Sequence, residues 1–160
     1  MNSPQPLLDE LARFDTPTVC NAIELFDVVP RNQGDMDGRV KCNFPQFPPI
    51  VGYASTAAFR SDAPPLKGDA YGSMQSQVET FAGLPGPPIV VFQDLDDPPM
   101  AAVFGEVIGS TYQAFGAQGL ITNGARRDVE QVRELGFPIF TGSTICSHGM
   151  LPDLPEMSFA

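Results

Sequence analysis

The chain has 160 residues, a length that suits one domain with a buried core. Hydrophobic residues make up 42% and charged residues 18%, an ordinary globular balance, and no apolar run approaches the length of a membrane span. The formal charge of −10 argues against nucleic acid as a general partner, because phosphate binding needs clustered lysine and arginine.

The N-terminal residues lack a basic region followed by an apolar one, so we expect no signal peptide and a cytoplasmic protein. Cys20, Cys42 and Cys146 are widely spaced, and no CxxC pair occurs. A structural zinc site is therefore not expected. We expect free, buried thiols, as in a reducing compartment.

The N-terminal third predicts one helix followed by an irregular connection. Thr16 is a suitable N-cap with Pro17 at the first helical position, and the apolar spacing that follows predicts a helix over 17–27. The proline-rich stretch 28–49 predicts an irregular connection with one short strand around 39–42.

From residue 50 onward, extended and helical patterns alternate. This alternation predicts an α/β fold with a largely parallel sheet and crossover helices. Neither an internal repeat nor a second domain is indicated, so we take 1–160 as one domain. The expected elements are a strand over 50–60, a loop over 61–67, a helix over 71–84, a doubly buried strand over 88–94, an acidic loop over 94–99, a helix from about 103 to 116, a strand at 120–121, a helix over 129–135 and a strand from 136 to 140.

The most informative stretch is 119–128. A short apolar run breaks at Asn123-Gly124, which predicts a strand, a tight turn and a helix whose first turn carries Arg127 and Asp128. Ligands of open α/β sheets bind beyond the carboxyl ends of strands. A guanidinium beside a carboxylate there can hold an anionic substrate next to a divalent cation. The alternative is a first-turn aspartate favoured by the helix dipole, with a solvated arginine beside it.

Three further groups are candidates. Glu106 begins the expected helix near Val103, where it could hold a water or act as a base, although an exposed helix-start glutamate is the simpler interpretation. The acidic loop 94–97 suggests Mg²⁺ or Ca²⁺, but its spacing fits no calcium loop. His148, the single histidine, gives weak support for a dyad with Cys146. No GxGxxG, P-loop, GxSxG or HExxH motif occurs.

Several segments together resemble one family, the RraA-like proteins (regulator of ribonuclease activity A), which include class II 4-hydroxy-4-methyl-2-oxoglutarate aldolases. The aldolases of this family carry an acidic residue, twenty intervening residues and then Arg-Asp. Glu106, twenty residues and Arg127-Asp128 reproduce that spacing. The segments that carry the resemblance are 16–23, 51–57, 104–106, 117–128 and 136–140.

The resemblance implies a layered α/β domain of the swivelling β/β/α type, assembled as a homotrimer or a hexamer. It implies a divalent-metal-dependent lyase, an aldolase or oxaloacetate decarboxylase, acting on a small 2-oxo acid through a pyruvate enolate. Arg127 would bind the substrate, Asp128 would ligate Mg²⁺ or Mn²⁺, and Glu106 would orient a metal-bound water for proton transfer. The backbone N–H groups of Val107 and Ile108 would bind the substrate carboxylate.

The sequence departs from the family pattern at three places. Glu106 stands where the aldolases have aspartate, and Asn123 stands where many members have aspartate before glycine. The family usually continues some tens of residues further, with closing strands and an acidic residue that reaches a neighbouring subunit. The alternative function is a non-catalytic oligomeric regulator of an RNA-processing enzyme. A third, the demethylmenaquinone methyltransferase role under which many such sequences are labelled, is disfavoured because no glycine-rich cofactor loop follows a first strand.

Overall fold

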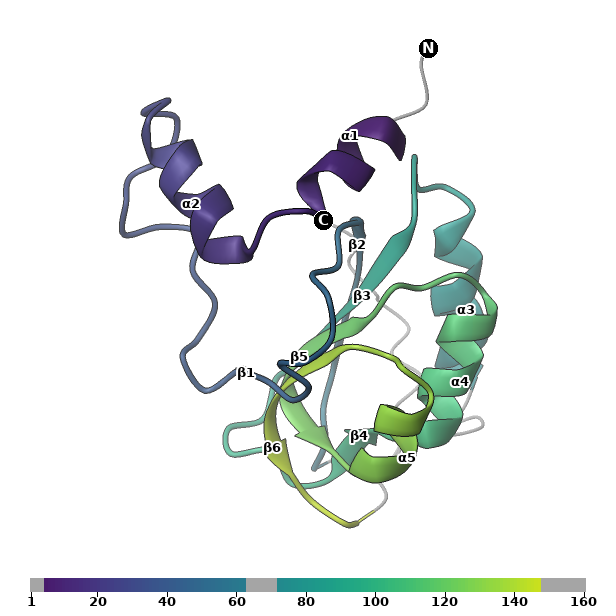
Figure 1. Cartoon of the computed structure of the whole chain (residues 1–160). Helices are drawn as coiled ribbons and strands as arrows, with labels where there is room; N and C mark the ends of the chain where they lie inside the picture. The colour runs from purple at the N-terminus through teal and green to yellow at the C-terminus, as the bar shows by residue number, and fades with distance from the viewer. Residues whose placement is uncertain (1–4, 63–71, 148–160) are drawn as a thin grey trace.

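The computed structural model describes residues 5–62 and 72–147 (Figure 1). The strands in these residues form one six-stranded sheet in the order β1-β6-β5-β3-β2, and β4 pairs with β5 beside this path. The strands are β1 (Lys41–Cys42), β2 (Tyr53–Phe59), β3 (Pro88–Asp94), β4 (Ala102–Phe104), β5 (Leu120–Arg126) and β6 (Ile139–Thr144). The helices are α1 (Gln5–Leu11), α2 (Thr16–Glu24), α3 (Gly72–Phe81), α4 (Glu106–Ala114) and α5 (Val129–Glu134).

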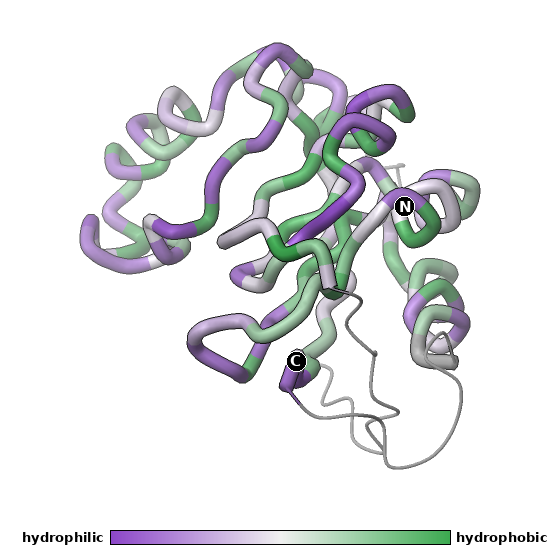
Figure 2. Tube along the Cα trace, turned by 90° about the horizontal axis from the view of Figure 1, so that it is seen from below, coloured by the Kyte–Doolittle hydropathy of each residue, from purple (hydrophilic) through white to green (hydrophobic). Residues whose placement is uncertain are grey.

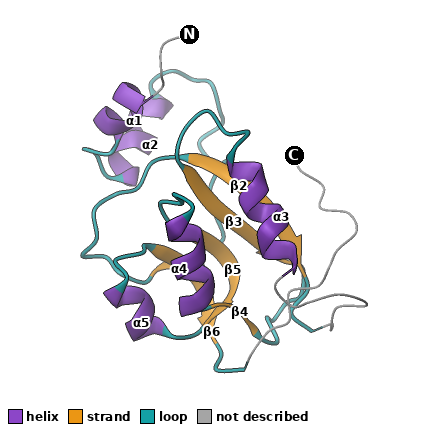
Figure 3. Ribbon diagram, turned by 90° about the vertical axis from the view of Figure 1, so that its right-hand side faces the viewer, coloured by secondary structure: helices purple, strands orange, loops and turns teal. Residues whose placement is uncertain are grey.

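The sheet is largely parallel, which confirms the expected α/β class. The pairs β2–β3, β3–β5, β4–β5 and β5–β6 are all parallel, and only the short edge strand β1 runs antiparallel to its neighbour β6. Helices α3, α4 and α5 lie over one face of the sheet (Figure 3). No helix in the described ranges is long and apolar enough to cross a membrane.

The central strands are buried because they are apolar on both faces. Val90 of β3 and Leu120 of β5 are fully buried, and their backbones pair in register. Phe104 and Tyr112 join them from β4 and α4, and the ring of Phe92 meets that of Tyr112 edge-on at 6.0 Å. The continuous apolar run of β3 fits the burial of most of its side chains at a central position of the sheet, between β2 and β5.

The predicted turn at Asn123-Gly124 is wrong, because β5 continues through it to Arg126. The Asn123 side chain replaces a backbone pairing partner: its Oδ1 accepts from the Asp94 N–H at 2.7 Å, and its Nδ2 donates to the Asp94 carbonyl at 2.8 Å. The register with β6 shifts between Thr122 and Ala125, as a β-bulge does. Asn-Gly here is a bulge within the strand rather than its end.

Helix α1 was not predicted, and α2, α3 and α4 end at Glu24, Phe81 and Ala114, two to three residues before the predicted ends. Two helix starts also differ from expectation. The N-cap of α2 is Asp15, whose carboxylate accepts from the Thr18 N–H at 2.8 Å, so Thr16 is already helical. The expected helix from about 103 is preceded by β4, and α4 begins at Glu106. Residues 102–104 are fully buried beside β5, so tertiary pairing overrides the helical pattern there.

A substitution at Gly142 would test how closely β6 approaches the bulge in β5. A Cβ on Gly142 would overlap the backbone carbonyl of Asn123, and backbone cannot swing aside. We expect Gly142→Ala to lower the free energy of unfolding by about 2 kcal/mol or more, measured by urea denaturation. Gly38→Ala is the control, because nothing lies within 4 Å of its Cβ position and we expect a change within about 0.5 kcal/mol. Equal stabilities of the two variants would contradict the close approach.

Candidate active site

The short strand β4 brings two distant segments to one corner. Its Phe104 lies opposite Arg126 of β5, and the Phe104 carbonyl accepts from the Arg127 N–H at 2.9 Å. The chain then passes through Gly105 and starts α4 at Glu106. Glu106 is thereby placed beside Arg127 and Asp128, from which twenty intervening residues separate it, at the carboxyl end of β5.

The Asp128 carboxylate connects the residues of this corner. Its Oδ2 accepts from the Glu106 backbone N–H at 3.2 Å and lies 3.4 Å from the Arg127 Nε. The side chains of Arg127 and Asp128 are each about one third exposed, at 32% and 35%. The structure therefore brings Glu106, Arg127 and Asp128 together at one partly open position.

Gly105 makes this approach possible. A Cβ at Gly105 would come within 2.5 Å of the Asp128 Oδ2 and 3.2 Å of the Arg127 Cγ. Gly105 is the N-cap of α4 and has no side chain to cap the helix, so the carboxylate of Asp128 takes that role from outside. The absence of a side chain at 105 leaves the space that the carboxylate occupies.

Asp128 itself has a left-handed backbone, with φ 53° and ψ 41°. Aspartate tolerates this region better than most residues, but the conformation still carries a cost. Asp128 precedes α5 as its N-cap, so the strained residue lies between the end of β5 and a new helix. Backbone strain of this kind is often found at functional sites, where surrounding contacts hold it.

Glu106 and the first turn of α4 present further polar groups. The Glu106 Oε1 accepts from the Ser110 Oγ at 2.7 Å, which fixes the side chain along the helix. Gly109 donates the first helical bond, to the Gly105 carbonyl, and no described residue accepts from the N–H groups of Val107 and Ile108. The Val107 side chain is exposed and that of Ile108 is buried. Two donors thus remain at the positive end of α4.

Arg126 is a part of this region that the sequence analysis did not single out. Its Nη1 donates to the Ser143 carbonyl at 2.9 Å and to the Thr144 Oγ1 at 2.6 Å, which directs the side chain toward β6. No carboxylate of the described residues lies within ion-pair distance of it. Burial lowers the pKa of the Arg126 guanidinium from its ordinary value.

The acidic loop after β3 serves a structural role. Asp94 Oδ1 accepts from the N–H groups of Ser61 and Asp96, at 3.3 and 3.0 Å. Asp96 pairs with Arg60 at 2.8 Å, and Asp97 pairs with Arg39 at 2.7 Å. The residues 5–62 and 72–147 contain no group of three or more His, Cys, Asp or Glu side chains arranged to hold a metal ion.

The cysteine prediction is half right. Cys20, Cys42 and Cys146 are free, as expected, but all three are exposed rather than buried. Cys20 lies on α2, which buries no residue, and Cys42 lies on the edge strand β1. His148 lies outside the described residues, so its proposed pairing with Cys146 stays a prediction.

Comparison with known families identifies the fold family. The model of the family described as "RraA-like: Aldolase/RraA" matches residues 16–153. The chain belongs to the RraA-like family. A comparison with curated proteins gave no significant match.

Solved structures share the RraA-like fold at low sequence identity. One, from work on novel cellulases of microbes associated with the gut ecosystem, has a TM-score of 0.72 and 21% identity over 92% of this chain and 61% of its own. RraAS2 from Streptomyces coelicolor, described as an unusual member of the RNase ES inhibitor RraA family, has a TM-score of 0.65 and 21% identity, covering 92% and 69%. The RNA-processing inhibitor RraA from Thermus thermophilus has a TM-score of 0.54 and 15% identity, covering 86% and 75%.

These likenesses establish the fold over 86% to 92% of this chain. At such identities they carry no activity over to this chain. The chain spans 61% of the length of the first of these structures and 59% of the length of another, an uncharacterized protein from Pseudomonas syringae pv. tomato str. DC3000. Within the RraA-like family, the corner formed by Gly105, Glu106, Arg127 and Asp128 is the feature whose chemistry must be argued from its own geometry.

Replacing Asp128 separates its structural contribution from its charge. Asp128→Ala removes the acceptor at the start of α4 and places alanine at a positive φ, so we expect unfolding free energy to fall by about 1–2 kcal/mol. Asp128→Asn keeps an oxygen acceptor and tolerates the left-handed backbone, so we expect a loss of less than about 0.5 kcal/mol. Urea denaturation measures both, with the exposed Glu134→Ala as control. An alanine variant as stable as the parent would exclude the capping role.

Proposed function

We propose that this chain is a divalent-metal-dependent lyase of the aldolase or oxaloacetate decarboxylase type, acting on a small 2-oxo acid. The observation that supports the proposal is the convergence of Glu106, Arg127 and Asp128 at the carboxyl end of β5. Membership of the RraA-like family, which contains such enzymes as well as non-catalytic members, is consistent with it.

The basic and N–H groups of the corner suit a 2-oxo acid. The guanidinium of Arg127 is partly exposed and can donate two parallel bonds to a carboxylate and the adjacent keto oxygen. The N–H groups of Val107 and Ile108 point from the start of α4, where an anionic group is favoured by the helix dipole. Together these donors would hold the pyruvate portion of a substrate.

The donor set at Asp128 suits a hydrated Mg²⁺ or Mn²⁺. Asp128 Oδ2 is engaged by Glu106 and Arg127, but Oδ1 has no partner among the described residues and is available as a hard oxygen ligand. Mg²⁺ is often held by one or two carboxylates and keeps several waters, so a single carboxylate is compatible with it. When bound, such a cation supplies Lewis-acid stabilisation of negative charge on the keto oxygen.

The reaction itself needs only a bond cleavage and a proton transfer. In oxaloacetate decarboxylation the bond between the methylene carbon and the distal carboxylate breaks, and its electron pair passes into the pyruvate enolate as CO₂ leaves. Arg127 would stabilise the enolate oxygen by charge. Glu106, held by Ser110, would direct a proton to the methylene carbon through a water, which yields pyruvate.

Loss of Arg127 should strongly reduce the proposed activity. We expect Arg127→Ala to lower kcat/KM for oxaloacetate decarboxylation with Mn²⁺ on the order of 100-fold, because the substrate carboxylate loses the guanidinium that would pair with it. Pyruvate release is the measurement, and Arg133→Ala on α5, an exposed arginine paired with Glu130, is the matched control. If the parent protein releases pyruvate no faster than Mn²⁺ alone, the lyase proposal fails.

Glu106 should act in the chemical step rather than in binding. We expect Glu106→Gln to lower kcat by about 100-fold with little change in KM, because the amide keeps the side-chain size but cannot relay a proton. Glu130→Gln, at an exposed carboxylate in the first turn of α5, is the control. Full turnover by the Glu106→Gln variant would remove Glu106 from the mechanism.

A regulatory role is the second candidate. Two structural relatives are described as RNA-processing or RNase inhibitors, and the charge of −10 would suit a basic protein surface. A pure binder has no need for the partly open Arg127–Asp128 corner, which favours the lyase. Binding of a purified RNA-processing endonuclease that persists in the Arg127→Ala variant, in a protein without lyase activity, would favour regulation instead.

A further inference from the structure

The guanidinium of Arg126 is a cation for which the proposed reaction has no role. Five of the seven arginines are paired with a carboxylate: Arg31, Arg39, Arg60, Arg127 and Arg133. The other two have no carboxylate partner in the described ranges, and of these Arg13 is exposed whereas Arg126 is partly buried. A charge held partly out of water without a counter-ion costs free energy, and a bound anion would offset that cost.

Two bonds to β6 hold the Arg126 guanidinium in a fixed position. Its Nη1 donates to the Ser143 carbonyl at 2.9 Å and to the Thr144 Oγ1 at 2.6 Å. The Nε is buried and has no acceptor, and Nη2, which also has none in the described part of the chain, is open to solvent. The protein therefore orients this guanidinium but leaves part of its donor capacity unused.

The position of Arg126 places this cation beside the candidate site. Arg126 ends β5 and is followed directly by Arg127, and β5 lies between β4 and β6. The Arg127 side chain adjoins Gly105 on the β4 side, whereas that of Arg126 is held on β6. Strands two positions apart in a sheet are separated by roughly 10 Å, so a ligand that lies across the end of β5 can meet both guanidinium groups. The carboxyl ends of β5 and β6 point downward in Figure 1, and Figure 2 is seen from that side.

We propose that Arg126 binds a second carboxylate, at the far end of a 2-oxo acid whose pyruvate portion is held by Arg127. The inference rests on the proposed function for the position of the pyruvate portion. The open Nη2 of Arg126 would donate a charge-assisted hydrogen bond to this carboxylate. Because Nη1 is already anchored on β6, little further ordering is needed when the ligand arrives. Arg126 would thus select 2-oxo acids with a second negative charge over those with a neutral end.

A purely structural arginine is the alternative. The register between β5 and β6 shifts between Thr122 and Ala125, just before Arg126, and the two bonds from Nη1 join the strands beyond this irregularity. In that role, loss of Arg126 would lower stability and would affect all ligands alike. The two roles therefore predict different ligand selectivities.

Binding of two matched ligands tests the proposal without any turnover. 2-Oxoglutarate and 2-oxopentanoate have the same carbon chain, and the far end is a carboxylate in the first and a methyl group in the second. Calorimetric titration of the full chain with Mn²⁺ present gives the Kd of each. We expect 2-oxoglutarate to bind at least about tenfold more tightly to the parent protein, and Arg126→Gln to bring the two Kd values within about twofold.

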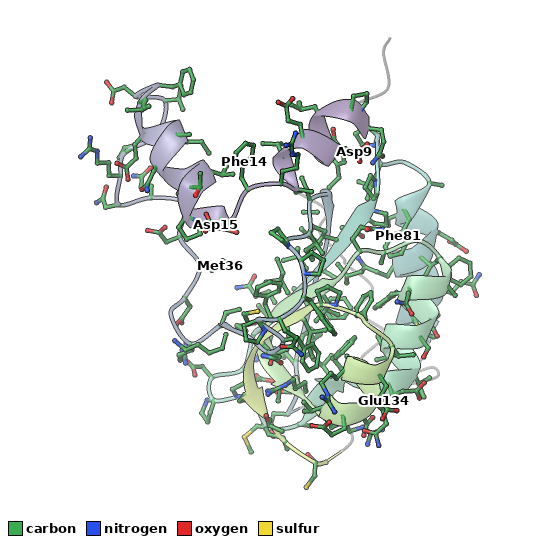
Figure 4. All side chains as sticks on the ribbon, in the orientation of Figure 1. Asp9, Phe14, Asp15, Met36, Phe81 and Glu134 are labelled. Atoms are coloured by element: carbon green, nitrogen blue, oxygen red, sulfur yellow. The ribbon has the colours of Figure 1, made fainter. Side chains whose placement is uncertain are left out.

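Arg13→Gln is the matched control, because it removes the same charge from the other arginine that has no carboxylate partner. Arg13 precedes Phe14 and Asp15, which Figure 4 labels on the segment between α1 and α2, away from the carboxyl ends of the strands. We expect this variant to keep the parent's preference for 2-oxoglutarate.

A second variant keeps the test decisive if Arg126→Gln does not fold, as judged by circular dichroism. Thr144→Val removes one acceptor of the Arg126 Nη1 but no charge. We expect it to show a preference for 2-oxoglutarate between that of the parent protein and none, because the guanidinium is present but less firmly held. A preference equal to the parent's would contradict the anchoring by β6.

Several results would overturn the role of Arg126. The parent protein could bind neither ligand or bind both equally, or the preference could persist in Arg126→Gln. Weaker binding of both ligands by Arg126→Gln, with the ratio of the Kd values unchanged, would assign the arginine its structural role. Pyruvate release from oxaloacetate judges the lyase function separately. A parent protein that releases no pyruvate, yet prefers 2-oxoglutarate through Arg126, would retain the binding group and lose the reaction.

Discussion

The contact between the Asp128 carboxylate and the start of α4 is the interaction on which the candidate site depends. It joins a helix that has no capping side chain of its own to the end of a strand from a later part of the chain. The same oxygen faces the Arg127 Nε. One carboxylate therefore orients the Arg127 guanidinium and accepts from the first backbone N–H of α4. Both contacts are possible because residue 105 is glycine and has no side chain. The geometry of the corner is therefore a property of the fold rather than of any ligand.

The alternation of apolar runs and helical spacing was enough to predict the sheet and most of its helices from the sequence. The strand over 88–94 and the helix over 71–84 depend on local pattern. Strand β3 has the predicted bounds, whereas α3 spans Gly72–Phe81 and ends three residues early, with Tyr71 outside the described residues. The pairing of Glu106 with Arg127 and Asp128 came from spacing and a family resemblance, and the fold brings the three residues together. Their catalytic roles stay a prediction.

Features that arise only from tertiary contacts could not be predicted from the sequence. Strand β4 has three residues, too few for a periodic signal, and it exists because β5 offers it a pairing edge. Asn123-Gly124 has the composition of a turn, but the Asn123 amide meets the backbone of Asp94 on the neighbouring strand. The exposure of α2, which buries no residue, could likewise not be predicted from its amphipathic spacing, because that spacing is equally typical of a helix packed on its own domain.

The half-buried Arg126 has a consequence for how ligands arrive. Its charge is not matched by a carboxylate among the described residues, whereas the neighbouring Arg127 is paired with Asp128, so Arg126 contributes an uncompensated positive charge in a protein of net charge −10. At long range the acidic surface repels an anionic ligand, whereas within a Debye length of about 8 Å the Arg126 guanidinium attracts it. Added salt would screen the distant repulsion more than the close attraction. An anion would then reach this corner faster, not slower, as ionic strength rises toward physiological values.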